Sequence, residues 1–286
     1  MRKVIVFGAG GAVGEACAHA LAAAGWRVVA SIRTKREDVA RRLQETCAEV
    51  RRDDLEGDGD WREAAASCDA LVFTTMLNLT VFALRRMQIG AQRIVAFSSN
   101  NIAIQPEAPL YVELAGAERS LREQGLNAAI LRPTLIYGDP RLPTLTRLMR
   151  AAKRSPYLPM PGSGRALLQP VFFEDLGRAA AWLSGAEDRG TFAIGGPDTV
   201  TMRSLYRAVI RAGGAKARIV PVPAWALRAG APVLRAMNFY SDDQILRADR
   251  DRLVAPQTPP PREIEARVGL REGLARLAAA LRGAGR

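Results

Sequence analysis

Short apolar runs alternate with helix-forming stretches through the first half of the chain. The β-branched and aromatic run Lys3–Phe7 ends at a glycine, and the Ala-rich stretch Ala12–Ala24 ends at Gly25, which predicts a strand, a tight turn and a helix. The same pattern predicts strands at 27–31, 48–51, 70–74, 93–98 and 128–131 and helices at 37–46, 80–89 and 112–124. Strands and helices that alternate over short connections predict an α/β fold with a doubly wound parallel sheet.

The first predicted turn is rich in glycine. Gly8, Gly11 and Gly14 are spaced as G-x-x-G-x-x-G between the first strand and the first helix. A side chain here would keep the backbone away from a pyrophosphate, whose charge rests on the N–H groups that begin the helix. We therefore predict a Rossmann dinucleotide-binding turn rather than a merely structural glycine turn. Its predicted contact residues are Gly8, Gly10, Gly11, Ala12, Val13 and Gly14.

The end of the second strand bears on which dinucleotide is bound. Ser31 and Arg33 stand there, with Lys35 and Arg36 just beyond. An acidic residue at this place would accept from the ribose 2′-OH and repel a 2′-phosphate, whereas these residues do the reverse. They predict NADP, with NAD the weaker choice. The alternative is that Arg33 stacks on the adenine or faces solvent.

The third strand runs into the acidic pair Asp53 and Asp54, followed by Leu55. A carboxylate at this strand end could accept a hydrogen bond from the adenine amino group. We accordingly predict Asp54 and Leu55 as cofactor contacts. The alternative is that the acid belongs only to the loop.

The charge of the chain narrows the classes of partner. Its 286 residues carry 41 basic and 29 acidic side chains, a net charge of +12, and nearly all the basic ones are arginines. This balance favours an acidic small-molecule ligand. The arginines are spread along the chain without a recognised nucleic-acid-binding motif, so a nucleic-acid partner is not expected.

Cysteine and histidine are scarce. Cys17, Cys47 and Cys68 lack C-x-x-C spacing, which disfavours disulfides and a metal site and fits a reducing compartment such as the cytoplasm. The single histidine, His19, lies in an Ala-rich helical run with no nucleophile motif to make a hydrolase triad. No uncharged apolar run reaches about 18 residues, so a membrane span is not expected.

Further motifs lie downstream of the glycine turn. They are Asp54-Leu55, Phe97-Ser98-Ser99, Leu131–Gly138 (L-R-P-T-L-I-Y-G), Pro159–Gly164 (P-M-P-G-S-G), Gln169-Pro170-Val171 with Glu174-Asp175, and Thr191–Gly196. Together they resemble the short-chain dehydrogenase/reductase superfamily, in its extended or atypical branch of sugar-nucleotide epimerases and dehydratases, over nearly the whole chain. The resemblance implies that the L-R-P-T backbone lies near the nicotinamide, and it adds Thr74, Ser98 and Pro133 to the predicted cofactor contacts.

The resemblance also implies two regions. A dinucleotide-binding core would comprise 1–138, with 170–196 returning to it. A smaller substrate-binding region would comprise 139–169 and 197–286. Its last part, 262–281, follows a run of three prolines and is amphipathic, as a packed helix or a homodimer face would be.

The sequence departs from the family at the proton relay. Family reductases use a serine or threonine, a tyrosine, and a lysine four residues later, because a phenol with a pKa near 10 needs an ammonium beside it to exchange protons at neutral pH. Tyr111 is followed four residues later by Ala115, and aligning on Glu118 instead puts Leu114 at the lysine position. Asn100 stands at the serine position.

Asn100 and Tyr111 are nevertheless the predicted catalytic pair. Asn100 could donate a hydrogen bond to a carbonyl, and Tyr111 could act through water; the alternative for Tyr111 is a packed aromatic at a helix start. Other acid–base side chains are more simply explained as solvated or capping residues: Glu113, Tyr137, Asp139, Tyr240, Asp242 and Asp243.

Two functions are compatible with these residues. The first is an NADP-dependent oxidoreductase that reduces or rearranges a small carbonyl or enone substrate with a non-standard proton donor, since hydride transfer needs only the cofactor held against the substrate. The second is an NADP-binding redox sensor or assembly factor without turnover, in which binding shifts a partner surface.

Overall fold

The chain divides into two compact units. We describe a computed structural model, which covers residues 1–33, 37–223, 225–226, 250–254 and 260–283. Unit 1 comprises Met1–Pro133, Phe173–Ile194 and the described part of 255–266; unit 2 comprises Thr134–Phe172, Arg267 onward and the described part of 195–254. Lys35, Arg36, Tyr240, Asp242 and Asp243, which were considered above, lie outside the described residues.

Unit 1 is built on a seven-stranded sheet in the order β11-β6-β5-β4-β1-β2-β3, in which every pair is parallel. The strands are β1 (Lys3–Phe7), β2 (Arg27–Ile32), β3 (Glu49–Arg52), β4 (Ala70–Phe73), β5 (Arg93–Phe97), β6 (Ala128–Pro133) and β11 (Gly190–Ile194). The order reverses beside β1, which makes this a doubly wound sheet. The predicted Rossmann fold is confirmed.

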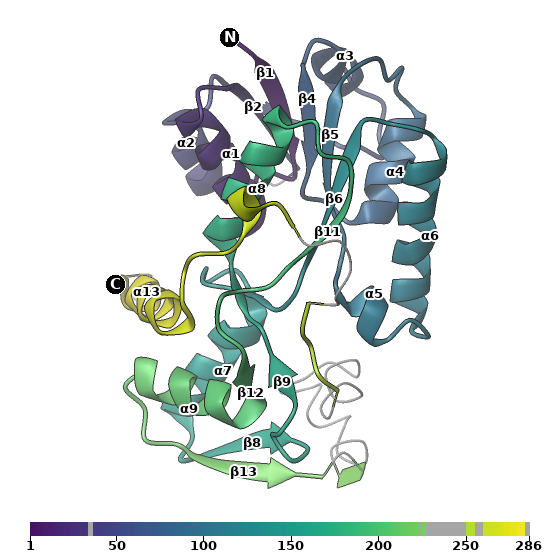
Figure 1. Ribbon diagram of the computed structural model, residues 1–286. Helices are drawn as coiled ribbons and strands as arrows, with labels where there is room; N and C mark the ends of the chain where they lie inside the picture. The colour runs from purple at the N-terminus through teal and green to yellow at the C-terminus, as the bar shows by residue number, and fades with distance from the viewer. Residues whose placement is uncertain (34–36, 224, 227–249, 255–259, 284–286) are drawn as a thin grey trace. The chain divides into compact units, whose positions relative to one another are not determined.

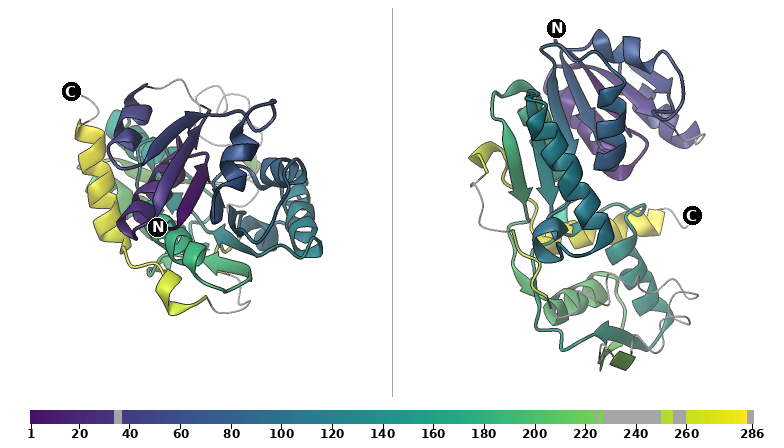
Figure 2. Two further views of the ribbon diagram at one scale, coloured as in Figure 1. Left: turned by 90° about the horizontal axis from the view of Figure 1, so that it is seen from above. Right: turned by 90° about the vertical axis from the view of Figure 1, so that its right-hand side faces the viewer.

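Helices cover both faces of the sheet (Figure 1). On one face lie α1 (Ala12–Ala23), α2 (Glu37–Gln44) and α8 (Phe173–Gly185); on the other lie α3 (Trp61–Ala66), α4 (Leu77–Arg85), α5 (Asn101–Ile104) and α6 (Pro109–Glu123). α4 and α6 run side by side (Figure 2). α6 begins three residues before the predicted start because Pro109 occupies its first turn, where the missing N–H costs nothing.

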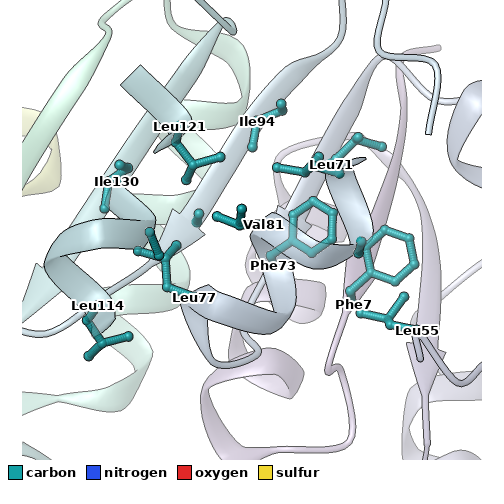
Figure 3. Close-up of a cluster of buried hydrophobic side chains, with 14 of the residues drawn as sticks. Phe7, Leu55, Leu71, Phe73, Leu77, Val81, Ile94, Leu114, Leu121 and Ile130 are labelled. Atoms are coloured by element: carbon teal, nitrogen blue, oxygen red, sulfur yellow. The ribbon is translucent and has the colours of Figure 1, made fainter. Parts of the chain in front are cut away.

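The core on the α4 and α6 side is apolar and closely packed (Figure 3). Phe7 stacks on Phe73 with ring centroids 4.7 Å apart, and Trp61 meets Phe7 edge-on at 6.0 Å. Trp61 is fully buried at the start of α3. The sequence pattern did not predict α3, because its six residues are too few to show a helical period.

The opposite face is closed by two segments that return late in the chain. Gly177 of α8 packs so tightly on α1 that a Cβ there would lie 2.5 Å from the Ala16 carbonyl oxygen. The 3-10 helix η1 (Arg262–Ile264) then packs against α8, where Ile264 is fully buried and Arg178 donates to the Glu263 carbonyl at 2.7 Å. We expected all of 197–286 to belong to the smaller region; η1 instead groups with unit 1, where it packs against α8.

In the residues that the structure describes, unit 2 combines short strands with the helices α7, α9 and α13. Its elements are β7 (Ile136–Tyr137), α7 (Pro143–Arg154), β8 (Tyr157–Pro161), β9 (Leu167–Leu168), β10 (Val171–Phe172), β12 (Val200–Thr201), α9 (Met202–Ala212), β13 (Arg218–Val222) and α13 (Leu270–Gly283). α7 and α9 pack against each other, and α13 packs against α9. α13 buries Leu270, Leu274 and Leu277, so its apolar face is used within the unit.

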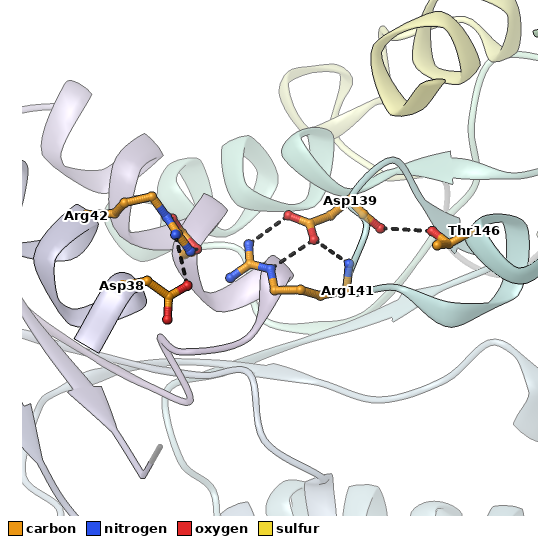
Figure 4. A network of polar contacts seen from close by, with 6 residues as sticks. Asp38, Arg42, Asp139, Arg141 and Thr146 are labelled. Atoms are coloured by element: carbon orange, nitrogen blue, oxygen red, sulfur yellow. Dashed lines mark hydrogen bonds and ion pairs between the residues drawn. The ribbon is translucent and has the colours of Figure 1, made fainter. Parts of the chain in front are cut away.

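The entry to α7 is held by one ion pair. Both carboxylate oxygens of Asp139 accept from Arg141, at 2.9 and 2.7 Å, and the Asp139 carbonyl accepts from Thr146 at 3.3 Å (Figure 4). Because this carboxylate is occupied by a neighbouring guanidinium, its role in the described structure is to fix the loop.

Candidate cofactor and active site

The glycine turn between β1 and α1 packs against the side chain of Thr74. Gly8 has a φ of +80°, and a Cβ on Gly14 would lie 2.2 Å from the Gly8 carbonyl oxygen and 2.7 Å from Thr74 Oγ1. Thr74 in turn donates to the Phe7 carbonyl at 3.0 Å. The backbone itself therefore requires glycine at positions 8 and 14. At Gly11 a Cβ would meet only the Gly8 oxygen, at an ordinary 3.5 Å, so the fold does not require glycine there.

Backbone N–H groups remain open at the start of α1. Those of Gly8 and Ala9 are used, since both donate to the Ser31 carbonyl, at 3.1 and 3.0 Å. Within the described part of the chain, no acceptor lies in hydrogen-bond range of the N–H groups of Gly10, Ala12 and Val13. Unsatisfied N–H groups at the positive end of a helix favour an anion.

Ser31 and Arg33 differ in exposure at the end of β2. Ser31 is buried, with 3% of its surface exposed. The Arg33 side chain is 74% exposed, and its nearest acid is Glu56, at 3.8 Å. The Arg33 guanidinium is exposed and among the described residues has only this long ion pair, which contributes little, so it is available to a ligand at this strand end.

The acids at the end of β3 are not equivalent. Asp54 is exposed and accepts from the Glu56 backbone N–H at 3.1 Å, which makes it a turn residue. The Asp53 side chain is only 3% exposed; its Oδ1 lies 3.5 Å from Arg51 Nε, and its Oδ2 has no hydrogen-bond partner among the described residues. The Leu55 side chain belongs to the apolar core. By burial and open hydrogen-bonding capacity, Asp53 is the better placed carboxylate, which the sequence motif did not single out.

The remaining predicted cofactor contacts lie at the carboxyl edge of the sheet. Thr74 follows β4, Ser98 follows β5, and Pro133 ends β6. Ser98 donates its N–H to the Leu131 carbonyl at 2.8 Å, while its buried Oγ has no partner in the part of the chain that the structure describes. Ligands of open α/β sheets bind at this edge, beyond the ends of the strands. The glycine turn and the Ser98 hydroxyl thus fit a dinucleotide.

The predicted catalytic pair, Asn100 and Tyr111, is linked by Asn101, which follows Asn100 and bonds to the Tyr111 hydroxyl. Asn100 is 1% exposed and donates its N–H to the Pro133 carbonyl at 3.1 Å. Tyr111 is 4% exposed, its ring is part of the core, and its hydroxyl oxygen accepts from Asn101 Nδ2 at 3.0 Å. Asn101 was not predicted, because nothing in the sequence tells that α5 turns its side chain toward α6.

The lysine position is apolar in the structure too. Ala115 packs against the core cluster. The alternative register rests on Glu118, which is fully buried and receives two hydrogen bonds from Arg132, at 2.8 and 2.5 Å. Because Glu118 is occupied by this buried ion pair, it serves to tie α6 to β6.

The three cysteines lie in surroundings that disfavour their thiolate forms. Burial raises the pKa of Cys17 and Cys68 above the usual thiol range, and burial together with the charge of Glu15 raises that of Cys47 to about 11. Glu15 is itself held by Arg42, at 2.7 Å, and Arg42 also reaches Asp38 at 3.3 Å (Figure 4). The described parts of the chain contain no cluster of three or more His, Cys, Asp or Glu able to hold a metal ion.

None of the helices in the described ranges combines the length and the apolar character needed to cross a bilayer.

The first half of the chain, including the glycine turn, matches a known protein family. A family model described as NAD(P)H-binding matches residues 8–156, a little over half of the chain. Among curated proteins, the uncharacterized protein y4nG of Sinorhizobium fredii is 30% identical over 114 residues, which are 39% of this chain and 29% of that protein. The match therefore spans under a third of the length of that relative.

Solved structures resemble the whole chain. UDP-glucose 4-epimerase of Thermotoga maritima, solved with UDP-glucose, has a TM-score of 0.73 and 16% identity over 99% of this chain and 100% of its own. dTDP-glucose 4,6-dehydratase of Bacillus anthracis, solved with NAD, has a TM-score of 0.72 and 12% identity over 99% of this chain and 97% of its own. MoeE5, solved with UDP-glucose and NAD, has a TM-score of 0.74 and 19% identity over 100% of both chains. At these identities the likeness shows a shared fold and nothing about the reaction.

Proposed function

The chain belongs to the NAD(P)H-binding family, and from this premise we propose that it is an NADP-dependent oxidoreductase of the extended short-chain dehydrogenase/reductase type. Its fold is that of the extended branch, as its motifs predicted. In the proposed reaction a small carbonyl or enone compound is reduced or rearranged with a non-standard proton donor. The observation that carries the proposal is the glycine turn, whose open N–H groups face no acceptor of the described chain.

The proposed cofactor site follows the carboxyl edge of the sheet. The N–H groups of Gly10, Ala12 and Val13 would hold the pyrophosphate, and the buried Ser98 hydroxyl would bond to the nicotinamide end. The bound dinucleotide supplies hydride chemistry. At the adenine end we propose Asp53 in place of Asp54, because Asp53 combines burial with an open oxygen.

The proposed proton donor is Tyr111, oriented by Asn101. The Asn101 amide donates to the phenol oxygen, so the hydroxyl hydrogen points away from Asn101. A neutral amide stabilises a phenolate less than an ammonium would, so Tyr111 rests as a neutral phenol and acts as the acid that gives its proton to the substrate oxygen, not as a base. Asn100, held by the Pro133 carbonyl, is the proposed second donor to a substrate oxygen.

Replacing the hydroxyl of Tyr111 tests this role. We expect Tyr111→Phe to lower kcat by roughly a hundredfold, as loss of a general acid does, while the NADPH dissociation constant stays the same. Turnover is measured as NADPH oxidation with a panel of carbonyl and enone compounds. Tyr157→Phe is the matched control, because Tyr157 is an exposed tyrosine of unit 2. Equal turnover in Tyr111→Phe and the parent protein would remove Tyr111 from the mechanism.

The preference for NADP is proposed from Arg33. We expect Arg33→Glu to weaken NADPH binding by roughly tenfold or more and to leave NADH within about threefold, because only NADPH carries the 2′-phosphate. Titrations follow nicotinamide fluorescence. Arg27→Glu makes the same charge change at the exposed, opposite end of β2 and should not discriminate. Equal affinities of the parent protein for the two cofactors would contradict the NADP assignment.

Two further expectations remain part of the proposal. A cytoplasmic location accords with three cysteines that form no disulfide. A homodimer is still proposed, although the buried face of α13 is accounted for within unit 2; sedimentation of the purified chain decides it.

A further inference from the structure

The positive charge of the protein is concentrated in one unit. The sequence ranges of unit 2 contain 21 basic and 7 acidic residues, whereas those of unit 1 contain 20 basic and 22 acidic. The excess of +12 in the whole chain is therefore carried by unit 2. Such a concentration attracts anions to this unit in particular.

Unit 2 also contains a cavity of about 620 Å³. This volume lies in the range of small-molecule sites. The cavity is formed by α7 and α9 with neighbouring loops and strands, and its apolar lining includes Leu135, Leu145, Leu148, Leu168, Met202 and Leu205. An apolar cavity of this size fits the body of a small organic molecule.

Three arginines line the same cavity from one face of α7. Arg147, Arg150 and Arg154 are spaced three and four residues apart, so they project from neighbouring turns of the helix. All three are exposed, and no carboxylate of the described residues lies within ion-pair distance of them. Like charges at this spacing repel one another. Elsewhere in the described chain arginines are commonly paired, as Arg141 is with Asp139.

The lining has little with which to recognise a sugar or a base. Among the described residues that line the cavity there is no Asp, Glu, Asn or Gln, and the uncharged polar groups are those of Thr144, Ser155 and Tyr206. Carboxylates and amides are the side chains that pair with vicinal hydroxyls and base edges. The described lining is thus poor in the side chains that pair with a sugar or a base.

From these observations we infer that the α7–α9 cavity binds an amphipathic anion, with its apolar body in the cavity and a carboxylate or phosphate head on Arg147, Arg150 and Arg154. A guanidinium fork suits either head group. As a statement about substrate class the inference rests on the proposed function. The binding itself does not, because every residue invoked belongs to unit 2.

Calorimetric titration of the full chain tests the inference. The probes are decanoate and decyl phosphate, with decanol as the uncharged body, acetate as the bare head group and UDP-glucose as the nucleotide sugar. We expect saturable binding of one or both decyl anions at one site per chain, and binding at least roughly tenfold weaker for the other three probes. The stronger of the two anions identifies the head group.

Two charge-matched variants separate the cavity from general attraction. Arg147→Gln with Arg150→Gln should weaken decyl-anion binding by roughly tenfold or more, since charged hydrogen bonds are lost. Arg165→Gln with Arg218→Gln removes two exposed arginines of the same unit that do not line the cavity, and should leave binding unchanged.

Several results would overturn the inference: no saturable binding of either decyl anion, UDP-glucose binding as tightly as they do, or equal losses in both double variants. NADPH titration of the same samples reports on the proposed function separately. Decyl-anion binding without NADPH binding would contradict the proposed function and keep the cavity assignment; the reverse result would contradict only the cavity assignment.

Discussion

Gly14→Ala is expected to destabilise the protein by about 3 kcal/mol, even before any ligand is added. The new Cβ would lie 2.2 Å from the Gly8 carbonyl oxygen and 2.8 Å from the Ala9 Cα. Both are backbone atoms and cannot rotate away, so the cost lies at the upper end of that for overpacking. Alanine gains about 1 kcal/mol in helix propensity, and the expected loss exceeds that gain. Urea unfolding followed by circular dichroism measures it.

Gly11→Ala is the matched control for this result. A Cβ at Gly11 has ordinary contact with the Gly8 oxygen, and the residue is exposed with a φ of −80°. We expect its stability to stay within about 1 kcal/mol of the parent, while its NADPH affinity falls by roughly tenfold because the methyl group stands beside the open N–H groups. Equal stability losses in the two variants would mean that the turn is not packed as described.

Arg132→Ala is expected to cost about 3–5 kcal/mol of unfolding free energy, because it leaves the carboxylate of Glu118 buried without its partner. Glu118 is fully buried and the Arg132 side chain is 10% exposed. Water therefore has little access to replace the lost hydrogen bonds. Urea unfolding again measures the change.

Two further variants show whether the cost of Arg132→Ala comes from the unpaired buried charge. Arg132→Met combined with Glu118→Leu removes both charges and should be more stable than Arg132→Ala by at least about 2 kcal/mol. Arg52→Ala breaks an exposed pair with Glu37 and should cost no more than about 1 kcal/mol. If the double variant were no more stable than Arg132→Ala, the cost would come from lost packing and not from an unpaired charge.

The sequence predicted those features of unit 1 that depend on local pattern. The strand–glycine–helix start and the alternation up to β6 follow from apolar periodicity and from backbone needs at Gly8 and Gly14. Asn101 was missed because its contact with Tyr111 depends on how a four-residue helix, α5, is turned against α6. The proposal of Asp53 in place of Asp54 likewise rests on their burial, which two adjacent acids do not reveal in sequence.

The cavity in unit 2 illustrates a different limit. In the sequence, Arg147, Arg150 and Arg154 were three among many arginines spread along the chain, and no helix was predicted there. Only the packing of α7 on α9 shows that these three arginines border an apolar space. The net charge of +12 was visible in the sequence, and its location became clear only when the chain had been divided into units.

The late return of α8 and β11 to the sheet has a consequence for synthesis on the ribosome. β6 ends at Pro133, and α8, which covers α1, begins only at Phe173. At ~5–20 residues per second, the roughly forty residues between them take about 2–8 s to make. During that interval the nascent sheet lacks both the strand that pairs with β6 and the helix that covers α1. An open strand edge and an uncovered apolar face are what chaperones bind and what promotes aggregation, so early folding of this chain should depend on chaperones during that window.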